Sequence, residues 1–190
     1  ENDDQLSLVA TRAGKVSIRE IFSEGRVVNT LTLWAAFFCC LLMVYALSSW
    51  LPKLMSSAGY GLNSSLAFLL VLNSGAIVGA IAGGWLGDRV GIANVLLCFF
   101  ACGALSLSLL ALKAPVAVLY LLIAVAGAST IGTQILANAC AVQYYPPHIR
   151  STGLGWAMGI GRLGAIVGPV LGGVLHSANL PSQSSFLAFA

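Results

Sequence analysis

Long uncharged apolar runs separated by short polar segments make up the chain after residue 26. Runs of about 20 residues can cross the ~30 Å hydrocarbon core of a bilayer as α-helices, which rise about 1.5 Å per residue. The pattern therefore predicts an all-α, polytopic membrane helix bundle. The predicted spans cover about residues 27–51, 65–86, 93–112, 116–142 and 152–175, with a truncated span from 186.

Helix-breaking and interfacial residues stand at the ends of these runs. Trp50 and Pro52 close the first span, and we predict a polar loop from Pro52 to Ser64. The fourth span should end before the segment from Tyr144 to Arg150, which contains two adjacent prolines. The spans are thus expected to be joined by short loops.

The first 26 residues are polar and hold nine of the fifteen formally charged side chains. Ser17 and Glu20 form a capping-box pattern, Ile18 and Ile21 follow on one face, and Gly25 is a plausible helix stop. Two interpretations stay open. The segment is either a short amphipathic helix on the membrane surface or a linker of no special function.

Composition agrees with a membrane protein and excludes a soluble domain. The chain is 58% hydrophobic and 8% charged, with a mean hydropathy of +0.93, whereas soluble domains carry about 25% charged residues. The net charge of +3 is too small to suggest a nucleic-acid partner. The lipid bilayer is the partner that the composition predicts.

The basic residues are unevenly distributed between the two predicted sides of the membrane. One side holds only Lys53 and Lys113, whereas the side of the N-terminal segment holds six. These six are Arg12, Lys15, Arg19, Arg26, Arg89 and Arg150. By the positive-inside rule the N-terminal segment is cytoplasmic, so we expect a multi-pass protein of a bacterial-type cytoplasmic (inner) membrane.

Arg162 is the one charged residue predicted to lie inside a span. It stands about ten residues into the fifth span, ~15 Å deep at helical rise, where a charge costs at least ~2.5–3.5 kcal/mol. The only acidic residue after Glu24 is Asp88, outside the spans. The partner of Arg162 is therefore an anionic ligand, a carboxylate from another part of the protein, or backbone carbonyls.

Uncharged polar residues also fall at membrane depth. Thr130, Gln134 and Asn138 recur every fourth residue and so share one face of the fourth helix. Such a stripe either joins neighbouring helices by hydrogen bonds or lines a polar cavity, and two amides in register favour the cavity. Tyr45 in the first span and Asn73 in the second are further candidates for a binding site.

Glycines repeat at every fourth position in two of the predicted helices. The two series are Gly75, Gly79, Gly83 and Gly87, and Gly164, Gly168 and Gly172. Small residues at this spacing let helix backbones approach closely in a membrane. We predict two tight helix–helix crossings.

The sequence offers little for metal binding or catalysis. Five cysteines lie in apolar runs without metal-ligand spacing, and we predict that they are small packing residues and that there is no metal site. The histidines, His148 and His176, fall in predicted loops on opposite sides, and no Gly-x-Ser-x-Gly motif occurs. An enzyme is not expected.

The segment Gly84-Trp-Leu-Gly-Asp-Arg-Val-Gly91 separates two apolar runs. An Asp-Arg pair cannot face lipid, so it predicts a turn at a membrane face. The segment resembles the loop signature G-x-L-x-D-R-x-G of major facilitator superfamily transporters. The stretch from Arg150 to Pro169 is similar to helix 11 of the aromatic acid:proton symporters of that superfamily, and Tyr45 to Pro52 resembles their helix 7.

The resemblance implies the C-terminal six-helix half of a facilitator fold, helices 7–11 plus the start of helix 12. Residues 1–26 would belong to the cytoplasmic central loop and residues 27–190 to the transmembrane half. A missing N-terminal six-helix half would be its partner. A half-size transporter that works as a homodimer is an alternative.

The resemblance also implies a cytoplasmic latch between the two halves. Its residues would be Gly84, Gly87, Asp88, Arg89, Gly91 and Arg150. At a helix N-terminus the Asp88 carboxylate would gain from the macrodipole. The segment Ile92-Ala93-Asn94 lacks the further basic residues that the superfamily usually places there.

The resemblance implies proton-coupled uptake of an aromatic carboxylate, such as 4-hydroxybenzoate or benzoate, by alternating access. We expect Arg162 to bind the carboxylate of this small organic anion, Tyr45 to contact the ring, and Gln134 and Asn138 to bind a ring hydroxyl. No cofactor is expected beyond the proton as coupling ion, and its carrier would lie in the missing half. Another facilitator, for drugs, sugars or dicarboxylates, is the alternative.

Overall fold

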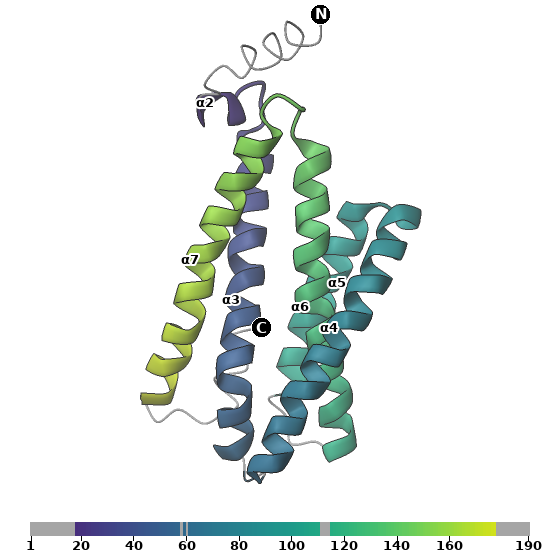
Figure 1. The fold of residues 1–190 in the computed structure, drawn as a ribbon, viewed down its shortest axis with the longest axis vertical. Helices are drawn as coiled ribbons and strands as arrows, with labels where there is room; N and C mark the ends of the chain where they lie inside the picture. The colour runs from purple at the N-terminus through teal and green to yellow at the C-terminus, as the bar shows by residue number, and fades with distance from the viewer. Residues whose placement is uncertain (1–17, 58, 60, 111–114, 178–190) are drawn as a thin grey trace, which may run out of the picture.

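The computed structural model describes residues 18–57, 59, 61–110 and 115–177 (Figure 1). The helices are α2 (Ile18–Ile21), α3 (Val27–Ser57), α4 (Leu62–Val90), α5 (Ile92–Leu110), α6 (Val116–Tyr144) and α7 (Arg150–Ser177). Helices α3 to α7 are long and apolar enough to cross a membrane, and no strand occurs in the described residues. The predicted all-α membrane bundle is confirmed.

The helices form two groups that lie side by side (Figure 1). In one group α3 packs along α7, and in the other α6 packs against both α4 and α5. Apolar side chains of α3, α4, α5 and α6 fill the space between the groups, among them Leu47, Phe68, Leu107 and Ile123, each no more than 1% exposed. The long helices thus share one interior.

Glycines allow the close approach of α4 and α6. A Cβ atom at Gly75 would collide with the carbonyl oxygen of Ala124, and one at Gly79 with that of Ala128. On the facing helix, a Cβ at Gly127 would collide with the carbonyl oxygen of Leu72. The first predicted tight crossing is confirmed.

The second glycine series brings α7 onto α3. A Cβ at Gly164 would collide with the carbonyl oxygen of Phe38, and one at Gly168 would lie 2.5 Å from that of Leu42. Nearby, the indole nitrogen of Trp50 donates a hydrogen bond to the carbonyl oxygen of Pro169 at 2.9 Å. This crossing, also as predicted, fixes the position of α7 relative to α3.

The predicted loop from Pro52 to Ser64 is wrong. Helix α3 continues through Pro52 to Ser57, and α4 already begins at Leu62. The added turn of α3 places Leu54 and Met55 in the core, where they are 4% and 2% exposed. Burial of these two side chains, at about 1.5–3 kcal/mol each, offsets the backbone hydrogen bond that proline removes.

The segment with the Asp-Arg pair is helical rather than a loop. Helix α4 runs to Val90, and the reversal is confined to Gly91, which has a φ of 96°. Only glycine adopts this conformation without strain. Asp88 therefore lies in the last turn of α4, and the prediction that it stands at a helix N-terminus is wrong.

The remaining helix ends differ from prediction by about two residues. Helix α5 covers Ile92–Leu110, α6 extends to Tyr144, and α7 begins at Arg150 and ends at Ser177. Arg150 is thus the first residue of a helix and not part of a loop. The predicted sixth span from 186 lies outside the described residues.

The short helix α2 is anchored on the bundle. Its Ile21 is fully buried, and the Thr30 hydroxyl donates a hydrogen bond to the Ile21 carbonyl at 3.3 Å. The Tyr145 hydroxyl in turn donates to the Thr30 hydroxyl at 3.4 Å, and burial raises the pKa of Tyr145. Ile21 thus anchors α2 to the bundle, and the surface helix and the plain linker both stay predictions.

Candidate functional site

Arg162 lies near the middle of α7, twelve residues after Arg150 and so ~18 Å along the helix. Its side chain is exposed, and its Nη1 donates a hydrogen bond to the Tyr45 hydroxyl of α3 at 3.3 Å. It makes no ion pair with any described residue. The structure thus joins two of the predicted site residues and leaves the charge of the guanidinium without an acidic partner in the described part of the chain.

The glycine crossing of α3 and α7 explains why these two side chains meet. Gly161, next to Arg162, packs against Phe37 and Leu41, where a Cβ would lie 3.3 Å from the Phe37 carbonyl oxygen. The two backbones are therefore close at this level. A side chain that leaves α7 one residue later can reach across the edge of α3 to Tyr45.

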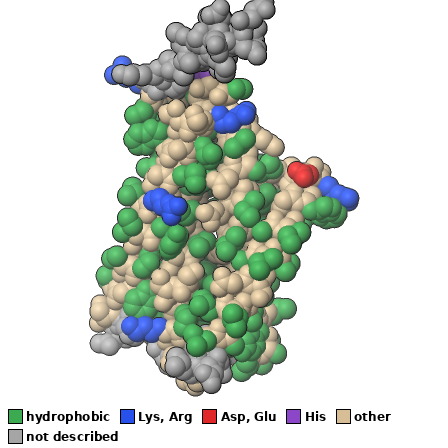
Figure 2. Space-filling model, viewed as in Figure 1, with side chains coloured by type: hydrophobic (Ala, Val, Ile, Leu, Met, Phe, Trp, Pro, Cys, Tyr) green, Lys and Arg blue, Asp and Glu red, His purple; other side chains and the backbone are tan. Residues whose placement is uncertain are grey.

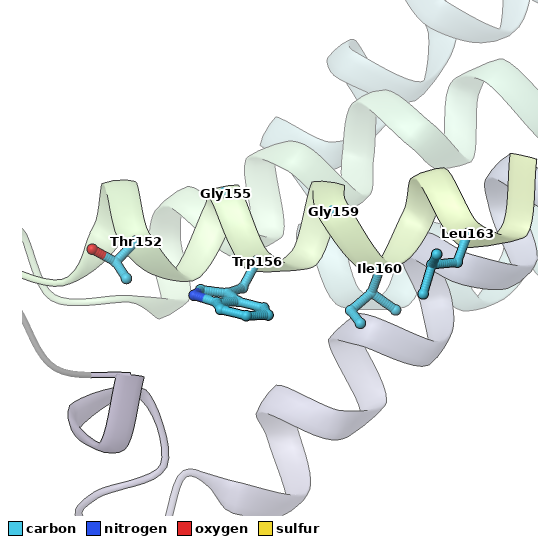
Figure 3. Close-up of a pocket in the computed structure, with 6 residues that line it drawn as sticks. All are labelled: Thr152, Gly155, Trp156, Gly159, Ile160 and Leu163. Carbon is cyan, nitrogen blue, oxygen red and sulfur yellow. The ribbon is translucent and has the colours of Figure 1, made fainter.

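An apolar groove runs along α7 from Thr152 to Leu163, the stretch of the helix that also carries Arg162 (Figure 3). Its volume is about 550 Å³, and its lining residues are Thr152, Gly155, Trp156, Gly159, Ile160 and Leu163. Trp156 stacks on Trp34 of α3 with ring centroids 6.1 Å apart, and a Cβ added at Gly155 or Gly159 would meet nothing within 4 Å. A flat floor beside an aromatic wall suits a planar ring.

Sequence reasoning missed Trp156. The residue stands between Gly155 and Gly159 in an apolar span, and this context was available in the sequence. A large aromatic side chain flanked by residues without side chains leaves space on its own helix face. This pattern of one aromatic residue between two glycines was a signal in the sequence from which the groove could have been predicted.

The polar residues of the α6 stripe differ in whether their side chains are hydrogen-bonded. Thr130 is buried, its hydroxyl donates to the Gly127 carbonyl at 3.0 Å, and its own carbonyl accepts from the Cys40 thiol at 3.3 Å. Thr130 is thus enclosed by packing, at the wall of a cavity of about 10 Å³ that is no larger than a water molecule. Asn138 differs, because its side-chain oxygen is buried and has no hydrogen-bond partner in the described part of the chain.

Gln134 and Asn73 are not joined to Arg162 in the described residues. Gln134 is half-buried on α6, and Asn73 is exposed on α4, where its Nδ2 donates to the Leu69 carbonyl of the same helix at 2.8 Å. Their roles in binding stay predictions.

The proposed latch residues occupy the end of α4 and the start of α7. Asp88 is exposed and makes no ion pair with any described residue. Its carboxylate is also disfavoured by the negative end of the helix dipole, because Asp88 stands at the C-terminus of α4. The guanidinium of Arg89 stacks on Trp85 at 4.1 Å. Arg150 donates from Nε to the Tyr145 carbonyl at 3.2 Å.

The cysteines fit the packing prediction only in part. Cys40 is buried and Cys140 half-buried, but Cys39, Cys98 and Cys102 are exposed. The prediction that all five are packing residues is wrong for these three. Among the described residues no group of three or more His, Cys, Asp or Glu could hold a metal ion.

The surface of the bundle agrees with a lipid environment. Figure 2 shows a face made mostly of hydrophobic and uncharged groups, with Lys and Arg side chains in isolated patches. Large apolar side chains are exposed along the helices, for example Leu70 and Ile81 at 71% each. The five spanning helices and this surface define an integral, multi-pass membrane protein.

Comparison with known proteins gives the family. The family model of the Major Facilitator Superfamily matches residues 2–169, and the chain belongs to this superfamily. It is 48% identical to the benzoate transport protein of Acinetobacter baylyi, over 91% of this chain and 37% of that protein. It is 41% identical to the gentisate transporter of Corynebacterium glutamicum, over 84% of this chain and 36% of that protein.

A third relative is the 4-hydroxybenzoate transporter PcaK of Pseudomonas aeruginosa, 35% identical over 82% of this chain and 35% of that protein. The chain thus spans little more than a third of the length of these relatives. All three carry transporter names, and none is named an enzyme. This confirms the resemblance to the aromatic acid group and the expectation of a protein that is not an enzyme.

Proposed function

We propose that the chain is the C-terminal half of a secondary transporter that takes up aromatic carboxylates by alternating access. The observation that carries the proposal is Arg162, a cation at mid-helix that pairs only with the Tyr45 hydroxyl among the described residues. An anion entering between the two halves would supply the missing charge. The names of the relatives support a benzoate-like acid as that anion.

The guanidinium suits a carboxylate better than other anchors would. Arginine offers five N–H donors in a planar fork, and the hydrogen bond to Tyr45 uses one of them. The others remain for charge-assisted, bidentate contact with the two oxygens of a carboxylate. Tyr45 holds the fork in place and adds an aromatic surface.

The rest of the substrate would be held by apolar walls and one acceptor. The groove along the same stretch of α7, with Trp156 in its lining, has a volume of about 550 Å³, which is room enough for an aromatic ring. The side-chain oxygen of Asn138, which no described residue pairs, would accept a hydrogen bond from a ring hydroxyl, with Gln134 and Asn73 as further polar groups. Asn138 would then favour hydroxylated acids.

Asp88, Arg89 and Arg150 are proposed to contact the N-terminal half on the cytoplasmic side, in an inner membrane with residues 1–26 cytoplasmic. Asp88 is exposed and without an ion-pair partner in the described residues, which supports a contact with another part of the protein. That contact would form and break as the halves rock. The proton carrier would lie in the N-terminal half, because Asp88 is the only acidic residue after Glu24.

Uptake by the complete transporter tests the proposed function. Cells without aromatic acid uptake that express the protein should accumulate labelled benzoate or 4-hydroxybenzoate, and a protonophore should abolish the accumulation. Unlabelled aromatic acids should compete, whereas sugars and dicarboxylates should not. Competition by a sugar or a dicarboxylate alone would instead favour the alternative of another facilitator.

The Tyr45→Phe variant tests how the arginine is held. Loss of the hydroxyl removes one hydrogen bond to Arg162, worth about 0.5–1.5 kcal/mol. We expect a rise in the KM for labelled benzoate of roughly two- to tenfold with kcat nearly unchanged. An unaltered KM at normal expression would show that the hydroxyl does not position the guanidinium.

A further inference from the structure

Two thiols stand one helical turn apart on α5. Cys98 and Cys102 are both exposed, and their spacing of four residues places them on the same face of the helix, with about 5–6 Å between Cβ atoms. Rotation of the two side chains alone can therefore bring the sulfur atoms together, without any change in the backbone.

The two thiols lie on the exposed side of α5, with Cys102 at the edge of its packed face, seven residues after Val95. The helix packs chiefly on α6 and α4, and its buried residues include Val95, Gly103 and Leu107. On the outer side Leu105 is 62% exposed. The thiol pair thus lies on an exposed side of a helix that can span a membrane, where apolar reagents dissolved in the bilayer can reach it.

We propose that Cys98 and Cys102 form a dithiol site for trivalent arsenic carried by an apolar aryl group. Trivalent arsenic is a soft centre that prefers thiol sulfur, and two adjacent sulfurs can bind it as a chelate. In the reaction with an aryl arsenoxide, two As–S bonds form and the bond from arsenic to oxygen breaks. The oxygen leaves as water with the two thiol protons, and no atom changes oxidation state.

The other cysteines do not offer this arrangement within the described part of the chain. Cys40 is buried, and its thiol donates a hydrogen bond to the Thr130 carbonyl. The exposed thiol of Cys39 therefore stands next to a thiol that a reagent outside the bundle does not reach. Cys140 lies on α6, half-buried. These residues provide matched single-thiol controls.

Dibromobimane labelling of the complete transporter in membrane vesicles tests the site. This reagent becomes fluorescent when both of its ends displace bromide to thiols only a few ångströms apart. We expect strong fluorescence from the wild type, loss of that signal in Cys98→Ser and in Cys102→Ser, and retention in Cys39→Ser and Cys140→Ser. Prior treatment with phenylarsine oxide should block the signal, and 2,3-dimercaptopropanol, but not 2-mercaptoethanol, should restore it.

The labelling does not depend on transport, so the site and the proposed function can fail separately. The fluorescence left in the double variant C98S/C102S measures any contribution from the other cysteines of this chain and from those outside it. Single variants as fluorescent as the wild type would overturn the proposal. So would a wild type no brighter than the double variant, or a phenylarsine oxide block that 2-mercaptoethanol reverses equally well.

Discussion

Replacing Arg162 by Ala in the complete transporter is expected to lower kcat/KM for labelled benzoate roughly 10- to 150-fold. The loss corresponds to the ~1.5–3 kcal/mol of a hydrogen bond to a charged group. Arg162→Lys should recover only part of the rate, because an ammonium keeps the charge but loses the planar fork that matches a carboxylate. Initial rates of uptake in whole cells measure both effects.

The control for this experiment is Lys53→Gln, which also removes one exposed cation. Lys53 stands near the C-terminal end of α3. Lys53 lies 4.7 Å from the ring centre of Trp50 and outside the proposed site. Its uptake should stay close to that of the wild type at equal amounts of protein in the membrane. Near-normal uptake by Arg162→Ala would remove the residue from the binding site.

Gly164→Leu is expected to prevent stable packing of α7 on α3. Even a Cβ atom at this position collides with the Phe38 carbonyl oxygen, and a backbone atom can move only with its helix. Overpacking typically costs about 1–3 kcal/mol, and displacement of a whole helix should exceed that range. We expect little monodisperse protein in detergent by size-exclusion chromatography and a lower midpoint of thermal unfolding.

Gly155→Leu is the matched control, because it lies on the same helix and a Cβ there meets nothing within 4 Å. Its unfolding midpoint should remain near that of the wild type, whatever its effect on uptake. Equal stability of the two variants would contradict the close crossing of α3 and α7.

The sequence predicted the helices and their crossings because both depend on local patterns. Apolar length identified α3 to α7, and the fourfold spacing of Gly164 and Gly168 identified one face for close packing. Arg162 stood out because a charge inside an apolar run is costly wherever the helix lies. Its partner Tyr45 was predicted only as one of several polar candidates.

The errors arose where tertiary contacts override local preference. Pro52 is a helix breaker by itself, but the burial of Leu54 and Met55 extends α3 past it. The fourfold spacing placed Thr130 and Asn138 on one face of α6. Only the structure shows that Thr130 is buried and that the Asn138 oxygen finds no partner among the described residues. A periodicity gives the face of a helix but not the neighbour that covers it.

The most direct test compares a charged ligand with a neutral ligand of the same shape. Isothermal titration calorimetry on the purified complete transporter would measure the affinities of benzoate and benzamide for the wild type and for Arg162→Gln. If Arg162 binds the carboxylate, the wild type should prefer benzoate by roughly tenfold or more, and the variant should lose this preference. An undiminished preference for benzoate in Arg162→Gln would show that the carboxylate is bound elsewhere.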